Sequence, residues 1–212
     1  MPTLQRERLA WAGQQLLIGV DEAGRGPLAG PVVAAAVVFP PGMRRIKGVR
    51  DSKTLPIARR EQLALLIRTR AIHIGIGAAS NREIDRVNIR VATALAMRRA
   101  VRHVLGTLSL PRGYHLVIDG LPLPEIGFPH EAVVDGDARC YSVAAASIVA
   151  KTVRDRIMRC LAQRYPHYGW DTNVGYGTPE HLDGIWRSGA TRHHRITFAP
   201  VAQHELWGTG YY

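Results

Sequence analysis

The chain has 212 residues, of which 46% are hydrophobic, so it can bury a core of its own. No segment approaches the roughly 18 consecutive apolar residues of a membrane-spanning helix, and residues 1–15 lack the apolar run of a signal peptide, which predicts a soluble, cytoplasmic protein. The formal charge of +11 favours a polyanionic partner, the alternative being a basic protein without one.

Two short apolar runs near the start of the chain, residues 16–20 and 31–39, are partly β-branched and are separated by a bend rich in Gly and Pro. They are expected to form the first hairpin of a sheet. Residues 55–70 then show helical spacing, with Thr54 as the expected N-cap and Pro56 in the first turn.

A second strand and helix follow. Residues 71–79 alternate as a strand, residues 88–105 return to a helical period, and residues 114–119 form the next predicted strand. The predicted order is β, β, α, β, α, β, to which residues 131–134 add one more strand.

The last third of the chain is predicted to be mainly helical. A long helix is expected from about Ser142, its N-cap, to about Gln163, and its small apolar start indicates burial against a sheet. From Tyr165 onward the chain is rich in aromatic residues, Gly and His, with a short helix expected at 179–187, after Thr178. We expect one mixed α/β domain over residues 1–212, with a C-terminal helical annex from about residue 165.

The two cysteines do not suggest a covalent framework. Cys140 and Cys160 form no C-x-x-C pair, so the sequence gives no support for a disulfide framework or a structural zinc site. Both are expected to be buried, reduced thiols.

Four acidic residues occur where predicted strands end: Asp21, Glu22, Asp119 and Asp137. Carboxylates at strand ends can converge on one edge of a sheet, where several of them need a hard cation such as Mg²⁺ or Mn²⁺ to relieve their repulsion. A single Asp at a strand end is more often a turn former or a helix cap. The combination of all four is what indicates a metal site.

The bend after the first strand, GVDEAGRGPLAGP at residues 19–31, surrounds Arg25 with glycines. Because neighbouring strand residues point to opposite faces, Asp21 and Glu22 share a site only if the strand ends or bends, which Gly24 and Gly26 permit. The spacing does not match a dinucleotide or P-loop motif, so a nucleotide cofactor is not expected. Glycines instead let a ligand hydroxyl approach the main chain, which suits recognition of a sugar.

Seven blocks spread over nearly the whole chain resemble, in order and separation, the type 2 ribonucleases H, and among them the bacterial ribonuclease HII family. They are GVDEAGRGPLAGPVVAAAV, DSKTL, IDRVNIRVATALAM, VIDG, SVAAASIVAKTVRD, GYGTPEH and HRITFAP. The related ribonuclease HIII has an additional N-terminal domain and a lysine in the glycine motif, whereas here the motif begins by residue 19 and carries Arg25. The resemblance implies a ribonuclease H-like fold, with a central mixed sheet flanked by helices, and a two-metal endonuclease.

The family's site residues map onto this chain one by one. The resemblance implies that Asp21, Glu22, Asp119 and Asp137 hold two Mn²⁺ or Mg²⁺ ions during catalysis, with Asp21 the best candidate to bridge them. It further implies that Gly24, Arg25 and Gly26 recognise the ribose, that Tyr176 stacks on the next sugar, and that Ser52 and Lys53 of the D-S-K loop hold a phosphate.

Several of these residues have competitors or plainer roles. Asp135 competes with Asp137, and the choice between them rests partly on the resemblance. Asp155 is expected to be structural, with Arg154, Arg156 and Arg159 as ion-pair partners. Tyr176 can be a packed aromatic of a loop, although glycines on both sides favour an exposed, stacking ring. His193 and His194 lack the spacing of a helical metal pair and are expected on a basic surface.

The implied activity is hydrolysis of RNA in RNA/DNA hybrids and incision on the 5′ side of ribonucleotides embedded in duplex DNA, leaving 3′-hydroxyl and 5′-phosphate ends. The implied roles are ribonucleotide excision repair and primer removal by a monomer. A junction resolvase of the same fold and a catalytically silent hybrid-binding module are the alternatives. The final residues, VAQHELWGTGYY, are a candidate contact for a sliding clamp.

Overall fold

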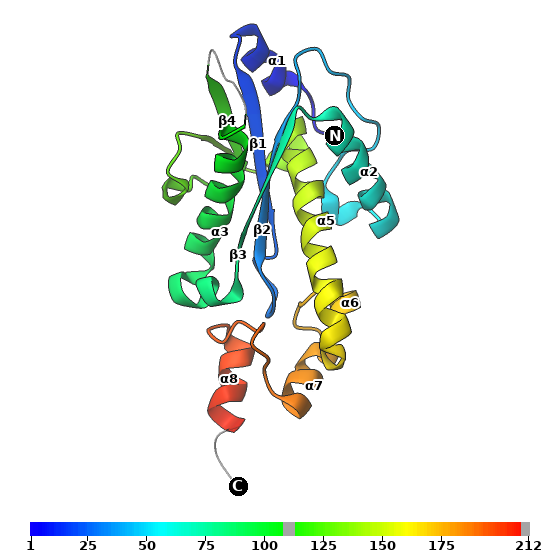
Figure 1. Ribbon diagram of the computed structural model, residues 1–212, viewed down its shortest axis with the longest axis vertical. Helices are drawn as coiled ribbons and strands as arrows, with labels where there is room; N and C mark the ends of the chain where they lie inside the picture. The colour runs from blue at the N-terminus through cyan, green and yellow to red at the C-terminus, as the bar shows by residue number, and fades with distance from the viewer. Residues whose placement is uncertain (108–112, 209–212) are drawn as a thin grey trace.

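The computed structural model describes residues 1–107 and 113–208, and side chains only up to residue 203. A five-stranded mixed sheet forms its centre, in the order β3-β2-β1-β4-β5 (Figure 1). The predicted hairpin is confirmed, because β1 pairs antiparallel with β2, while β4 joins the other side of β1 in parallel. The strands are β1 (Leu16–Ala23), β2 (Val32–Val38), β3 (His73–Ala79), β4 (Tyr114–Asp119) and β5 (Glu131–Val133). Within the described ranges, no helix is long and apolar enough to cross a membrane.

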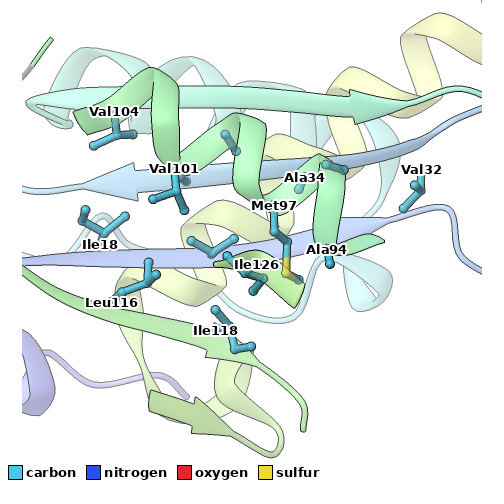
Figure 2. Close-up of a cluster of buried hydrophobic side chains, with 14 of the residues drawn as sticks. Ile18, Val32, Ala34, Ala94, Met97, Val101, Val104, Leu116, Ile118 and Ile126 are labelled. Carbon is cyan, nitrogen blue, oxygen red and sulfur yellow. The ribbon is translucent and has the colours of Figure 1, made fainter. Parts of the chain in front are cut away.

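One face of the sheet is covered by α3 (Asn81–Leu105). Because side chains alternate along a strand, Ile18 of β1 and Ala34 of β2 point to this same face. There they belong to one buried cluster with Met97 and Val101 of α3, as Figure 2 shows. This core fixes the even-numbered residues of β1 on the α3 side.

The other face is covered by α2 (Ile57–Arg70) and α5 (Tyr141–Arg164), which pack on residues such as Ala35 and Val37. The predicted mixed sheet flanked by helices is therefore confirmed. α5 lies directly on β1, since a Cβ atom at Gly19 would be 2.3 Å from the carbonyl carbon of Ser142 in that helix. This close approach places one face of α5 along the odd-numbered residues of β1.

The N-terminus of α5 differs from the prediction. Cys140 is the N-cap and Ser142 lies inside the helix, where its backbone N–H donates to Glu7 Oε1 at 2.7 Å. Glu7 is buried and belongs to α1 (Gln5–Ala12), a helix that was not predicted. A carboxylate from a distant element thus replaces the expected serine cap.

The starts of α2 and α3 also differ. α2 begins at Ile57 with Pro56 as its N-cap, whereas Thr54 ends a 3₁₀ turn, Ser52–Thr54. α3 begins seven residues before the predicted start, at a capping box formed by Ser80 with Glu83. The predicted start at residue 88 coincides with Asn88, which has non-helical φ and ψ angles of 67° and 166° and kinks the helix.

The described part of the C-terminal annex has three helices: α6 (Trp170–Asn173) beside the end of α5, and α7 (Pro179–Ser188) and α8 (Ala199–Gly208) below the sheet in Figure 1. α7 follows Thr178 as predicted, and Thr178 is its N-cap, accepting a hydrogen bond from the backbone N–H of His181. A separate apolar cluster joins the annex to the end of α5, around Met158 and Trp170. The remaining short elements are a 3₁₀ turn at Pro124–Ile126, α4 (Gly136–Arg139) and a 3₁₀ turn at Pro166–Tyr168.

The two cysteines lie in different environments. Cys140 is buried as expected, and burial raises the pKa of its thiol far above the usual range. Cys160 is exposed, which contradicts the prediction, because it lies on the outer side of α5, between the buried Met158 and Ala162.

Candidate active site

A single cavity of about 620 Å³ lies where β1 and β4 end. All ten residues that the sequence singled out for metal, ribose, phosphate and sugar contacts line it. They are Asp21, Glu22, Gly24, Arg25, Gly26, Ser52, Lys53, Asp119, Asp137 and Tyr176.

The parallel register of β1 and β4 brings the first carboxylates together. The last paired residues are Val20 and Ile118, so Asp21 and Asp119 each follow the end of the pairing. The strand was expected to end or bend between Asp21 and Glu22. Instead, β1 continues to Ala23, because its pairing with β2 persists. Asp21 and Glu22 therefore alternate along an intact strand, and both line the cavity because β4 no longer covers that edge.

The loop after β5 adds the fourth carboxylate. Asp119 Oδ1 accepts a hydrogen bond from the backbone N–H of Gly136 at 2.7 Å, which fixes the start of α4 beside the end of β4. Asp137 then lies on the cavity, whereas Asp135 is exposed, with a φ of 55° at the N-cap of α4. The geometry therefore favours Asp137 over Asp135 as the fourth acid.

The carboxylates repel one another in a poorly hydrated place. Burial raises the pKa of Asp21 well above its usual range, and the charges of Glu22 and Asp119 raise it further. Burial also raises the pKa of Glu22, although Arg25 opposes this, and it raises that of Asp137, to which the charge of Asp119 adds. Such a cluster is stabilised by a cation.

The four carboxylates fit a hard divalent cation, because such ions bind preferentially to oxygen ligands. Among the described residues, no three His, Cys, Asp or Glu side chains are arranged to hold an ion together as they stand. Mg²⁺ needs only one or two protein carboxylates and keeps several waters, so this arrangement is compatible with it. Asp21, Glu22, Asp119 and Asp137 are the residues that would hold the metal.

The D-S-K loop reaches the cavity from the side of α2. Asp51 accepts a hydrogen bond from the backbone N–H of Lys53 at 2.9 Å, and Ser52 Oγ lies 2.9 Å from Ser147 Oγ of α5. The Ser147 side chain also lies close enough to Asp21 to lower the pKa of that carboxyl against the effect of burial. Ser147 thus connects the loop to the carboxylates, a role that the sequence did not reveal.

Arg60 and Lys151 also line the cavity, and neither was predicted. Both pair with the buried Asp155, Arg60 Nη2 at 2.6 Å and Lys151 Nζ at 2.8 Å. Asp155 therefore pairs within the structure, although not with the three arginines expected. The i, i+4 spacing of Lys151 and Asp155 was visible in the sequence, whereas the partner on α2, 95 residues away, was not.

The glycine loop meets Tyr176 on the other side of the cavity. Gly24 has a φ of +97°, and a Cβ atom there would lie 1.9 Å from Arg154 Nε, so only glycine fits. At Gly26 a Cβ atom would meet only Tyr176 Cε1, at 3.6 Å. The Tyr176 ring is 46% exposed, as expected for a stacking rather than a packed aromatic.

The two adjacent histidines do not share a basic surface. His194 is 1% exposed and its Nδ1 accepts from the backbone N–H of Thr191 at 2.8 Å, within a cluster of rings that includes Trp170. His193 is half-buried against Tyr165. The prediction was wrong for His194, which aromatic residues of the annex enclose, whereas His193 does lie near the charges of Arg192, Arg164 and Arg82.

Comparison with known proteins identifies the family of this chain. The family model described as Ribonuclease HII matches residues 18–201. Ribonuclease HII of Cupriavidus necator is 52% identical over 195 residues, covering 92% of this chain and 80% of the relative. The ribonuclease H2 structure from Pyrococcus horikoshii OT3 superposes with a TM-score of 0.74 at 25% identity, covering 93% of this chain and 100% of the other. A PCNA:RNase HII complex from Archaeoglobus fulgidus gives 0.72 at 26% identity, covering 86% and 95%.

The fold of these structures is the ribonuclease H-like fold that the resemblance implied. A family model that spans most of the chain and a relative that is identical at half of the aligned positions are sufficient to assign the family. The chain therefore belongs to the ribonuclease HII family, endonucleases that hydrolyse RNA in RNA–DNA hybrids.

Proposed function

We propose that the enzyme also cuts on the 5′ side of single ribonucleotides embedded in duplex DNA, leaving 3′-hydroxyl and 5′-phosphate ends. One observation carries this proposal: the carboxylates, the glycine loop and Tyr176 line the same cavity. A reaction centre, a possible ribose contact and an aromatic ring for the neighbouring sugar are thus within reach of one short stretch of nucleic acid.

The proposed mechanism uses two divalent ions, Mn²⁺ or Mg²⁺, held by Asp21, Glu22, Asp119 and Asp137. Such ions activate water and stabilise the negative charge on the leaving oxygen. The protein's contribution is to hold four carboxylates at a fixed edge of the sheet. Their mutual repulsion, visible in the raised pKa of Asp21, favours occupation by cations.

Cationic and hydroxyl groups in the same lining, beside the carboxylates, are suited to the phosphodiester backbone. Lys53 is exposed on the D-S-K loop, and Ser52 is held in place by Ser147. We assign both to a phosphate near the scissile bond. Arg25 Nη1 lies 3.4 Å from Glu22 Oε1, so its side chain screens one carboxylate from the approaching backbone.

Selection of the ribonucleotide is assigned to the glycine loop and Tyr176. Gly26 has no side chain, so a sugar can approach its backbone directly. The half-exposed ring of Tyr176 can then stack on the next sugar, where a second 2′-hydroxyl would crowd it. This arrangement favours an RNA-to-DNA junction.

We infer that residues 1–212 act as one catalytic domain, because the site needs both the sheet and Tyr176 of the annex. A monomer in the cytoplasm, acting in ribonucleotide excision repair and primer removal, fits a charge of +11 and a duplex substrate. A family relative forms a complex with PCNA, which favours a sliding-clamp contact here. The segment proposed for that contact lies mostly outside the described side chains.

One assay tests the proposed function. End-labelled duplex DNA with a single ribonucleotide is incubated with the enzyme and Mg²⁺ or Mn²⁺, and the product ends are mapped. We expect one cut on the 5′ side of the ribonucleotide, with a 3′-hydroxyl. Cleavage of a continuous hybrid but not of this duplex would refute the junction specificity, and no cleavage of either would favour a silent binding module.

A further inference from the structure

Arg195 is fully buried behind the glycine loop, outside the lining of the cavity. Its guanidinium donates to the carbonyl oxygens of Gly24 at 2.5 Å and Arg25 at 2.7 Å. It also donates to the carbonyl oxygen of Gly30 through Nε at 3.1 Å and Nη2 at 3.0 Å. One side chain thus holds both ends of the loop that lines the cavity.

Burial of the charged Arg195 side chain costs free energy, so its hydrogen bonds to the glycine loop must offset that cost. Among the described residues, no carboxylate lies within ion-pair distance of Arg195, and the nearby cation of Arg154 adds repulsion. Burial, together with Arg154, lowers the pKa of Arg195 to about 9. A charge is retained in such a place only where its hydrogen bonds are numerous, and the planar fork of arginine supplies four here.

The contacts of Arg195 determine the direction of two N–H groups. The chain has no cis peptide bonds, and in a trans peptide the C=O of one residue points opposite to the N–H of the next. Because the carbonyls of Gly24 and Arg25 point inward to Arg195, the N–H groups of Arg25 and Gly26 point away from it. Arg25 and Gly26 line the cavity, and within the described part of the chain neither N–H has an acceptor.

We propose that Arg195 is a positioning residue for ribose recognition, which turns the N–H groups of Arg25 and Gly26 toward the 2′-hydroxyl oxygen of the substrate. This inference rests on the proposed ribonucleotide specificity and adds a residue from outside the cavity. A 2′-deoxy sugar has no oxygen there and would leave both donors unpaired. The sequence conceals this role, since Arg195 stands in a basic run that resembles a phosphate-binding surface.

The first test uses Arg195→Lys, which keeps the charge but loses the fork. The matched control is Arg159→Lys, an arginine of α5 whose partner is the half-exposed Glu61. For each variant we measure kcat/KM on duplex DNA with one embedded ribonucleotide, and the inhibition constant of the all-DNA duplex of the same sequence. Circular dichroism and Tm report whether the fold is kept.

We expect Arg195→Lys to lower kcat/KM by about tenfold to a hundredfold while the inhibition constant of the all-DNA duplex stays within about twofold. Arg159→Lys should match the wild type in both. An unchanged kcat/KM, or equal weakening toward both duplexes, would overturn the inference. If the wild-type enzyme does not cut the embedded ribonucleotide at all, the proposed function fails and not only the role of Arg195.

A second measurement needs no variant and therefore does not depend on its folding. In ¹⁵N-labelled wild-type protein in EDTA, the amide resonances of Arg25 and Gly26 are followed as each duplex is added. We expect a downfield shift with the ribonucleotide-containing duplex and a much smaller one with the all-DNA duplex. Equal shifts with both would show that these N–H groups do not contact the 2′-hydroxyl.

Discussion

Gly26 and Tyr176 are neighbours in the lining of the cavity, where a methyl group on Gly26 would come into van der Waals contact with the tyrosine ring. A Cβ atom on Gly26 would lie 3.6 Å from Tyr176 Cε1 and within 4 Å of no other non-neighbouring heavy atom. Gly24, two residues earlier, differs in kind: its φ is +97° and a Cβ atom there would lie 1.9 Å from Arg154 Nε. The absence of a side chain at Gly26 thus leaves the backbone open to a ligand, whereas at Gly24 it is needed for the chain to adopt this conformation beside Arg154.

Gly26→Ala should therefore keep the fold and impair the reaction. We expect Tm close to that of the wild type, because the new methyl group makes an ordinary contact, and up to about a hundredfold loss of cleavage, because the sugar is displaced by that group. Gly24→Ala should instead destabilise the protein by about 1–3 kcal/mol through backbone strain and the Arg154 clash. Thermal unfolding and cleavage assays on both variants check this; a reversed pattern would mean that the two roles are misassigned.

Tyr176→Ala should reduce cleavage more on a single embedded ribonucleotide than on a continuous RNA/DNA hybrid. Losing a stacking contact of roughly 1–3 kcal/mol corresponds to about a five- to hundredfold effect when it is felt in the transition state. Tyr176→Phe, which keeps the ring, is the control and should stay near wild type on both substrates. Equal losses on the two substrates would make Tyr176 a general binding residue.

Asp155→Asn tests the buried ion pairs beside the cavity. It leaves Arg60 and Lys151 without their shared carboxylate, and breaking a buried pair costs about 3–5 kcal/mol. For a chain of this size we expect Tm to fall by roughly 6–20 °C. Asp183→Asn, which breaks an exposed i, i+4 pair with Arg187, should change Tm by no more than about 2 °C. Similar Tm values for both variants would show that the Asp155 pairs contribute little.

Acid should weaken the start of α3. The hydrogen bond from Arg99 to Glu83, together with those within the capping box, lowers the pKa of Glu83 to about 2. A carboxyl whose pKa is lowered by folding contributes stability that is present above its unfolded value of 4.5 and is lost as the pH falls toward about 2. The Tm advantage of the wild type over Glu83→Gln should thus shrink between pH 6 and pH 2; a constant difference would contradict this.

The sequence predicted most of the fold because local patterns decide it. Alternation predicted β3 to within two residues, the bounds of β4 were predicted without error, and Thr178 preceded the predicted start of α7. The errors occur where a distant residue or a kink intervenes. Glu7 of α1 caps α5 in place of Ser142, and Asn88 interrupts α3 where its helical period was taken to begin.

The residues of the candidate site were predicted from motifs, but motifs do not reveal contacts between residues that are far apart in the sequence. Arg60 reaches Asp155 across 95 residues, and Arg195 reaches Gly24 across 171. Neither contact has a periodic or local signature, and a buried arginine bonded to carbonyls looks in sequence like any surface cation. The sequence indicated that Asp21 and Glu22 point to opposite faces of their strand. Only the structure showed that both line the cavity, because β4 no longer pairs with β1 beyond Val20.

Calorimetric titration of Mn²⁺, combined with cleavage of the single-ribonucleotide duplex, tests most directly whether the four carboxylates hold the metal. The variants are Asp119→Asn, whose amide oxygen can still accept from Gly136, and Asp135→Asn, at an exposed position where a φ of 55° suits asparagine. We expect Asp119→Asn to weaken Mn²⁺ binding by about tenfold or more and to remove most cleavage, with Asp135→Asn equal to the wild type. Near-wild-type binding and cleavage by Asp119→Asn, or an equal loss in Asp135→Asn, would contradict the assignment.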